Sequence, residues 1–122
     1  MADRSPLLVA GALDAALAVG LGAFAAHGLK ARLEPRLLEV FETGARYQMY
    51  HALAIVFCGL LVARYPAAAA AGWIFQLGIV LFSGSLYALA LTDIKVLGAV
   101  TPFGGVAFLV GWLWLAYAAW RG

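Results

Sequence analysis

The two histidines are the residues best suited to carry chemistry in this chain of 122 residues. His27 ends one apolar run and His51 lies about one helical turn inside the next, so the connection between the runs brings both to the same end. Two converging imidazoles could bind a metal ion or a haem if acceptors oriented their rings. Alternatively, His51 could relay a proton or, together with Arg46, hold an anionic lipid headgroup. The simplest alternative is structural, with one local hydrogen bond for each ring.

Other polar residues are expected to gather around the histidines. Residues three, four or seven apart share a helix face, so Tyr47, Gln48 and Cys58 lie on the same face as the second histidine. The expected ligand or proton cluster consists of His27, Arg46, Tyr47, Gln48, His51, Ser83, Tyr87 and Thr101. The sequence has no nucleophile elbow, phosphate loop or cysteine pair. We therefore assign no catalytic residue, favour a protein that is not an enzyme, and expect no cofactor.

Asp14 and Gln76 are polar residues deep inside apolar runs. An ionisable side chain near the middle of a membrane helix costs about 2.5–3.5 kcal/mol, so it is a functional candidate. At about 1.5 Å per residue, Asp14, Gln76 and Cys58 share one depth. The first two could form a proton or cation site, or a hydrogen bond that joins two helices. Because no cation lies at that depth, the hydrogen bond is the favoured interpretation.

The composition shows that these residues lie in a membrane protein. Apolar residues make up 66% of the chain, charged residues 11%, and the mean hydropathy is +0.96. Soluble domains are about 45–50% apolar and about 25% charged, and one this small could not bury so much apolar surface. This excludes a soluble enzyme and a disordered tail. The net charge of +2 is too small to indicate a nucleic-acid partner.

We predict an all-α polytopic membrane protein. A spanning helix needs about 20 mostly apolar residues. The chain, read as one domain over 1–122, offers a bundle of four transmembrane helices at approximately 6–26, 47–65, 67–91 and 96–120. Residues 35–43 have one apolar face, which fits a short helix lying in the membrane interface between the first two spans. Gly44 would then let the chain turn into the second span.

Charge and aromatic residues indicate an orientation. With four spans, both termini lie on one side, which holds three basic residues, whereas the other side holds five: Lys30, Arg32, Arg36, Arg46 and Lys95. Because short cytoplasmic loops are enriched in Lys and Arg, this favours a cytoplasmic 27–46 loop in a bacterial inner membrane. The terminal-side half also contains all the tryptophans, as an interfacial aromatic belt would: Trp73, Trp112, Trp114 and Trp120.

Segments 21–29, 43–54, 81–87 and 101–112 carry motifs that appear together in one family. In this order they resemble the transmembrane-protein-256-like family, a set of small uncharacterised membrane proteins. The resemblance implies four spans and the signature positions His27, Tyr47, Gln48, His51, Ser83, Ser85, Tyr87, Thr101 and Pro102. Ala25 replaces a usual glycine, and Asp14 belongs to none of the motifs. The resemblance implies no reaction, because the family has no established biochemical function.

Three functions are compatible with these residues. The favoured one is a non-catalytic bundle that binds lipid or a partner membrane protein and could form a homo-oligomer. The second is a small channel, transporter or proton relay that uses His51, Gln76 and Asp14. The third is a metal or haem redox protein that uses His27 and His51. Small size, the expected interfacial helix and the lack of a catalytic motif favour the first.

Overall fold

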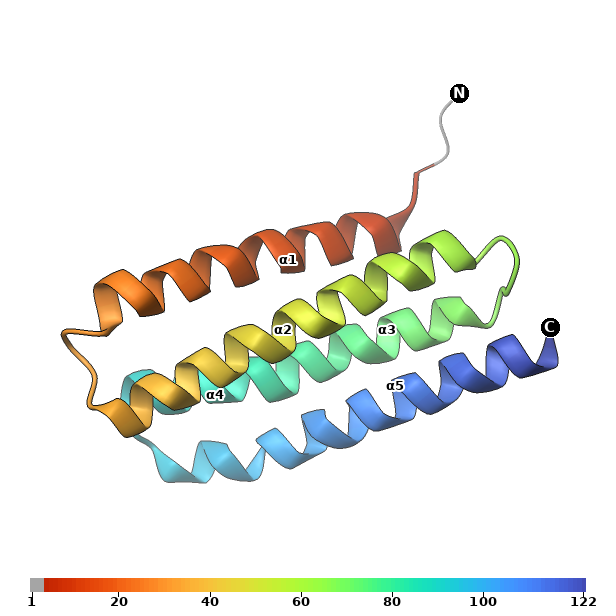
Figure 1. The fold of residues 1–122 in the computed structure, drawn as a ribbon. Coiled ribbons are helices and arrows are strands. Elements are labelled where there is room, and N and C mark those ends of the chain that lie inside the picture. The colour runs from red at the N-terminus through yellow and green to blue at the C-terminus, as the bar shows by residue number, and fades with distance from the viewer. Residues whose placement is uncertain (1–3) are drawn as a thin grey trace.

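The structure is a computed structural model that describes residues 4–122, and this part of the chain is entirely helical apart from short connections. Figure 1 shows long helical rods that lie side by side and alternate in direction. In chain order the elements are α1 (Pro6–Phe24), the π-helical turn η1 (Ala25–Leu29), α2 (Pro35–Leu61), α3 (Ala68–Gly78), the π-helical turn η2 (Ile79–Ser83), α4 (Gly84–Thr92), the 3₁₀ turn η3 (Lys95–Ala99) and α5 (Thr101–Arg121).

The helix ends follow from local sequence. Pro6 and Pro35 occupy first-turn positions of α1 and α2, where the missing proline N–H has no partner to lose. Ser5 caps α1 by accepting a hydrogen bond from the Leu8 N–H at 3.2 Å. The elements α3, η2 and α4 follow one another without a break and form the third rod. This rod ends where α4 stops at Asp93, which adopts a left-handed conformation with φ of 54°. These signals place the connections, and the C-terminus lies at the same end as the α2–α3 connection (Figure 1).

The prediction of four transmembrane helices with a separate interfacial helix is wrong. Within residues 4–122, three helical segments are long and apolar enough to cross a membrane: Pro6–Leu29, Ala68–Thr92 and Lys95–Arg121. Residues 47–61 of the predicted span 47–65 belong to α2, whose first half is charged, and the rest lie in the connection that follows it. The apolar part of α2, 47–61, is about 22 Å long at 1.5 Å per residue, which is shorter than a hydrocarbon core of about 30 Å.

The predicted interfacial helix is the first part of α2. Residues 35–61 form one continuous helix, so Gly44 makes no turn. Instead, a Cβ atom at Gly44 would lie 2.9 Å from the Tyr87 ring, and glycine therefore permits close approach of α2 to α4. The apolar face of residues 35–43 packs against the rest of the protein and not against lipid headgroups, because Leu37 and Phe41 are buried in the molecule.

The core has two apolar clusters. Near the end that holds the C-terminus, Ile55, Cys58 and Phe75 are fully buried among residues of α1, α2, α3 and α5. Near the other end, Phe41 packs against Ala25 and Leu29 of the η1 turn. Between them α2 runs through the middle of the molecule and contacts α1, α3 and α4. Polar residues on this central helix are therefore the ones that can meet partners from several rods.

Candidate functional site

His51 lies on α2 in an aromatic cluster, and both of its ring nitrogens have partners. Nδ1 lies 2.8 Å from the Tyr47 carbonyl oxygen, and the Trp112 indole N–H donates to Nε2 at 3.1 Å. A carbonyl only accepts and an indole only donates, so the ring is neutral with its proton on Nδ1. The ring also stacks on Phe108, with 3.6 Å between centroids and 5° between planes. His51 thus joins α2 to α5.

Gln48 connects three helices one turn away. Its amide N–H donates to the Asp14 backbone oxygen of α1 at 2.8 Å, and its carbonyl accepts from the Tyr87 hydroxyl of α4 at 2.7 Å. Ser83, fully buried in the η2 turn, donates to the Gly44 carbonyl of α2 at 2.7 Å. π-Helical turns are rare in proteins, and those that occur are often found at functional sites. Here η2 places the Ser83 hydroxyl against α2.

Ser85 and Thr101 form a third polar contact. Their hydroxyl oxygens lie 2.5 Å apart, and Ser85 also donates to the Phe82 carbonyl at 2.9 Å. This contact ties the start of α4 to the start of α5. The candidate cluster is thereby divided. Six of its members make hydrogen bonds or ring contacts between the rods: Tyr47, Gln48, His51, Ser83, Tyr87 and Thr101. Among residues 4–122, the other two members, His27 and Arg46, make no such contact.

His27 and Arg46 lie apart from these contacts. Both side chains are exposed, and Arg46 donates only to the neighbouring Thr43 hydroxyl, at 3.1 Å. Because Phe41 packs against Ala25 and Leu29, His27 is level with Phe41, about 15 Å along α2 from His51. The structure therefore does not bring the two histidines together. In the described part of the chain, no three side chains of the metal-ligating types converge.

Asp14 and Gln76 face one another from α1 and α3. The Gln76 side chain is within interaction range of the Asp14 carboxyl. However, Asp14 Oδ2 and Gln76 Oε1 are both buried and have no hydrogen-bond partner among residues 4–122. An amide oxygen only accepts, so Gln76 Oε1 could bond to the Asp14 carboxyl only if that carboxyl carried a proton or the amide were turned over.

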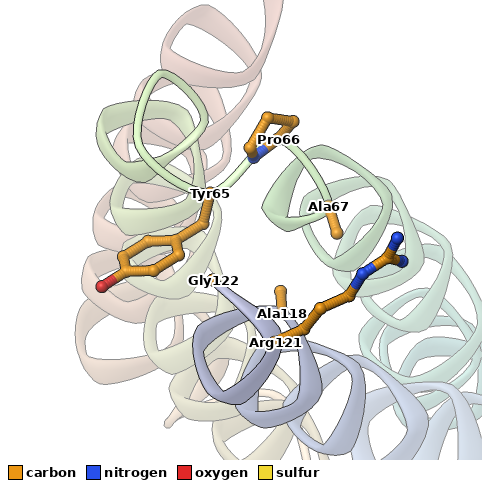
Figure 2. Close-up of a pocket in the computed structure, with 6 residues that line it drawn as sticks. All are labelled: Tyr65, Pro66, Ala67, Ala118, Arg121 and Gly122. Atoms are coloured by element: carbon orange, nitrogen blue, oxygen red, sulfur yellow. The ribbon is translucent and has the colours of Figure 1, made fainter.

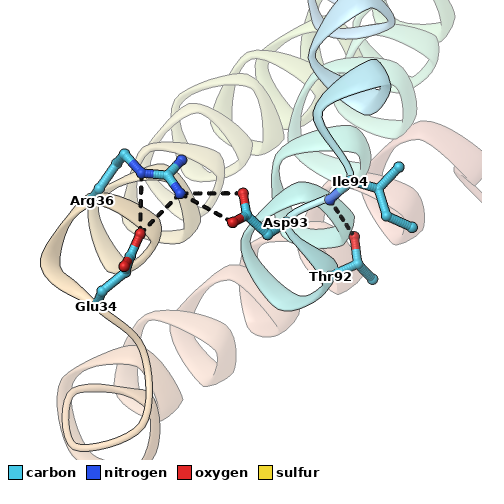
Figure 3. Close-up of polar contacts among 5 residues, drawn as sticks. All are labelled: Glu34, Arg36, Thr92, Asp93 and Ile94. Atoms are coloured by element: carbon cyan, nitrogen blue, oxygen red, sulfur yellow. Dashed lines mark hydrogen bonds and ion pairs between the residues drawn. The ribbon is translucent and has the colours of Figure 1, made fainter.

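Exposed ion pairs connect the turn before α2 with the turn after α4. Arg36 lies 2.9 Å from a Glu34 oxygen and donates to both carboxylate oxygens of Asp93 at 3.2 Å (Figure 3). The Asp93 hydrogen bonds raise the pKa of the Arg36 guanidinium above its ordinary value. Thr92 accepts from the Ile94 N–H at 3.2 Å in the same turn. Such exposed pairs fix a turn more than they stabilise a fold.

Cavities border the part of the bundle that the structure describes. One of about 270 Å³ lies between the α2–α3 connection and the end of α5, with Arg121 as its charged residue (Figure 2). A second, of about 320 Å³, lies where α1 begins, beside Arg4 and Trp73. A third, of about 210 Å³, lies between α1 and α2 and is lined by Ala18, Gly22, Glu42, Ala45 and Arg46.

Trp112 and Phe108 are site residues that sequence reasoning missed. Trp112 was expected to belong to an interfacial belt, but its N–H points into the molecule toward His51. A tryptophan inside an apolar span needs an acceptor for this N–H, which was the available signal. The partner is 61 residues away in the chain, so no local spacing could identify it.

Comparisons with known proteins agree with a membrane protein of unknown function. The model of a family described as "Protein of unknown function (DUF423)" matches residues 21–105. The UPF0382 membrane protein YwdK of Bacillus subtilis is 48% identical over 115 residues, which cover 92% of this chain and 94% of that protein. The UPF0382 membrane protein SERP0230 of Staphylococcus epidermidis is 48% identical over 112 residues, covering 91% and 92%.

No solved structure matches this chain. The bacterial relatives and the three apolar helices confirm an integral bacterial membrane protein. They also confirm the coarser part of the family prediction, an uncharacterised family of membrane proteins. The likeness to the transmembrane-protein-256-like family stays a resemblance, because the matching names are DUF423 and UPF0382.

Proposed function

The chain belongs to the DUF423 family, whose function is unknown, and we propose from its geometry that it is a non-catalytic membrane protein that binds phospholipid at its outer surface. The observation that carries this proposal is that the polar side chains where α2 contacts the other helices already have partners. His51 uses both ring nitrogens, Gln48 uses both ends of its amide, and Ser83 is bonded to a backbone carbonyl. These groups hold helices together and have little capacity left for a substrate.

The outer surface has the opposite character. Leu13 of α1 and Phe103 and Leu113 of α5 expose 65%, 69% and 70% of their surface. Large apolar side chains of this kind are stable only against lipid tails or another apolar surface. The cavities also lie at helix ends and along the α1–α2 seam. Both features support binding at the periphery.

Thermal unfolding of the detergent-purified protein tests this proposal. A ligand that binds the folded state stabilises it in proportion to RT ln(1 + [L]/Kd). Added phospholipid should therefore raise the unfolding temperature, whereas the same amount of a detergent without a phosphate should not. An unfolding temperature that does not respond to any phospholipid would contradict lipid binding.

A proton relay is the second candidate, and Asp14 and Gln76 favour it. The buried Asp14 carboxyl could bind and release a proton, and the unpartnered Gln76 oxygen could accept a hydrogen bond from it. This candidate predicts proton flux through liposomes that contain the protein, and Asp14→Asn should abolish the flux without unfolding the protein. Flux equal to that of empty liposomes would exclude the relay. The lipid-binding proposal instead predicts no flux and a nearly silent Asp14→Asn substitution.

A further inference from the structure

The groove between α1 and α2 combines small residues with two opposite charges. Ala18 and Gly22 form its α1 side, and Glu42, Ala45 and Arg46 form its α2 side. A Cβ atom built at Gly22 would meet nothing within 4 Å, so this part of the groove is open. Glu42 and Arg46 are four residues apart and therefore lie on one helix face, about 5–6 Å from each other at Cβ.

The groove lies alongside a membrane-spanning helix. Gly22 and Ala18 precede Leu29, the end of the first candidate span, by about 10 and 16 Å along the helix. The span of 24 residues is about 36 Å long, so only about 3 Å at each end extends beyond a hydrocarbon core of about 30 Å. The backbone that carries Glu42 and Arg46 therefore lies below the membrane surface on the loop side.

Both charged side chains lean toward that surface. Side chains on a helix lean toward its N-terminus, and the N-terminus of α2 is at the loop end of the molecule (Figure 1). The bond from Arg46 to Thr43, three residues earlier, shows this direction. Long charged side chains near a membrane surface commonly place their heads there in this way. The groove thus directs a carboxylate and a guanidinium toward the headgroup layer.

Neither charge has an ionic partner. Among residues 4–122 the ion pairs are those of Arg36 with Glu34 and Asp93. The Arg46 guanidinium has five N–H donors, and Thr43 accepts one of them. No hydrogen bond within that range satisfies the Glu42 carboxylate, although this side chain is half-buried. With no partner among residues 4–122, the Glu42 carboxylate is therefore free to bind a group from outside the chain.

We propose that this groove binds a phospholipid whose headgroup carries both a phosphate and a primary ammonium, such as phosphatidylethanolamine. Arg46 binds the phosphate, because a guanidinium matches phosphate oxygens with paired N–H donors. Glu42 accepts from the ammonium, and the two-carbon linker lets one headgroup reach two side chains one turn apart. One acyl chain lies along Ala18 and Gly22. This inference rests on the proposed function and names its ligand and its site.

Competition between lipids tests the headgroup. The purified protein is mixed with equal amounts of phosphatidylethanolamine, phosphatidylcholine and phosphatidylglycerol, and the bound lipids are weighed by native mass spectrometry. The ethanolamine lipid should bind about tenfold better than the choline lipid, which has a phosphate but no N–H to donate; this is the effect of about one charge-assisted hydrogen bond. Equal binding of all three lipids would overturn the proposal.

Charge variants separate the two contacts. Glu42→Gln should remove the preference for the ethanolamine lipid but leave binding of phosphatidylglycerol intact. Arg46→Gln should weaken binding of all three lipids. Glu39→Gln and Arg32→Gln are the matched controls, because both residues are exposed and lie outside the groove, and neither should change the preference. A preference that survives Glu42→Gln would overturn the assignment of the ammonium.

A pair of glycines tests the groove itself. Gly22→Leu fills the groove, whereas Gly20→Leu adds the same side chain outside it, and both positions have open space above the backbone. Only Gly22→Leu should abolish selective binding, and both variants should unfold at the same temperature as the wild type. Equal lipid selectivity in both would overturn the proposal.

Three failures are distinguishable. Lipid binding without headgroup preference overturns this inference but leaves the proposed function standing. No lipid binding at all overturns both. A dimer that Glu42→Gln or Arg46→Gln dissociates would mean that a second copy of the chain pairs with these charges, and it too would overturn the inference.

Discussion

At the scale of single residues, the buried polar side chains connect helices that are distant in the sequence. The contact between His51 and Trp112 spans 61 residues, and that between Gln48 and Tyr87 spans 39. In apolar surroundings a polar group that loses its partner retains the full cost of desolvation. Each of these hydrogen bonds therefore matters more through the partner it would leave unpaired than through its own strength.

Trp112→Phe should destabilise the protein. The substitution keeps an aromatic ring against Phe75, which lies 4.8 Å away between centroids, but it leaves His51 Nε2 buried without a donor. The expected loss is about 1–3 kcal/mol, measured by thermal unfolding in detergent. Trp120→Phe is the control, because Trp120 is 90% exposed and should change stability little. Equal effects of the two substitutions would contradict the role given to the His51 hydrogen bond.

Sequence reasoning grouped Gln48 with Tyr87 but missed Trp112 as the partner of His51. Tyr47, Gln48 and His51 were placed on one helix face, which the 3.6-residue period of a helix determines. The same period says nothing about which rod packs against that face. His27 was grouped with His51 because the connecting loop was expected to bring their helices level, whereas the helical register places His27 beside Phe41.

At the scale of elements, glycines determine how closely α5 packs on the third rod. A Cβ atom at Gly104 would collide with the Phe82 backbone nitrogen in the η2 turn, and one at Gly78 would collide with the Phe108 ring. Backbones that approach this closely leave no space for even a methyl group. The close approach also holds Phe108 where it stacks on His51.

Gly104→Ala should therefore force α5 away from η2. Overpacking of this kind costs about 1–3 kcal/mol, which thermal unfolding would reveal as a lower unfolding temperature. Gly105→Ala is the neighbouring control, because its added Cβ would come no nearer than 4.0 Å to the Phe82 side chain. If Gly105→Ala destabilised the protein as much as Gly104→Ala, the close approach of α5 to η2 would not be the cause.

The error in the sequence-based fold also belongs to this scale. The face formed by Leu37, Leu38 and Phe41 is the same whether it rests on lipid headgroups or on other helices, because periodicity reports a face and not its partner. Charges between positions 36 and 46 made an interfacial segment the natural interpretation. Those charges instead lie on a long helix, α2, beside the apolar α1.

At the scale of the whole molecule, composition alone predicted a helical membrane protein. Apolar residues make up 66% of the 122 residues, and a domain of this size cannot bury that much apolar surface away from water. The number of spans was harder to predict, because α2 has an apolar half and a charged half. The lipid-binding groove was not predicted at all, since it depends on which face of α2 meets α1.

The most direct test of the central claim is native mass spectrometry of the protein extracted gently from its own membrane. Lipid binding predicts a complex of the chain with at least one phospholipid, retained after a detergent wash that removes bulk lipid. Washing should release it more readily from Gly22→Leu than from Gly20→Leu. Bare protein under the same conditions, or a bound partner protein in place of lipid, would contradict the claim.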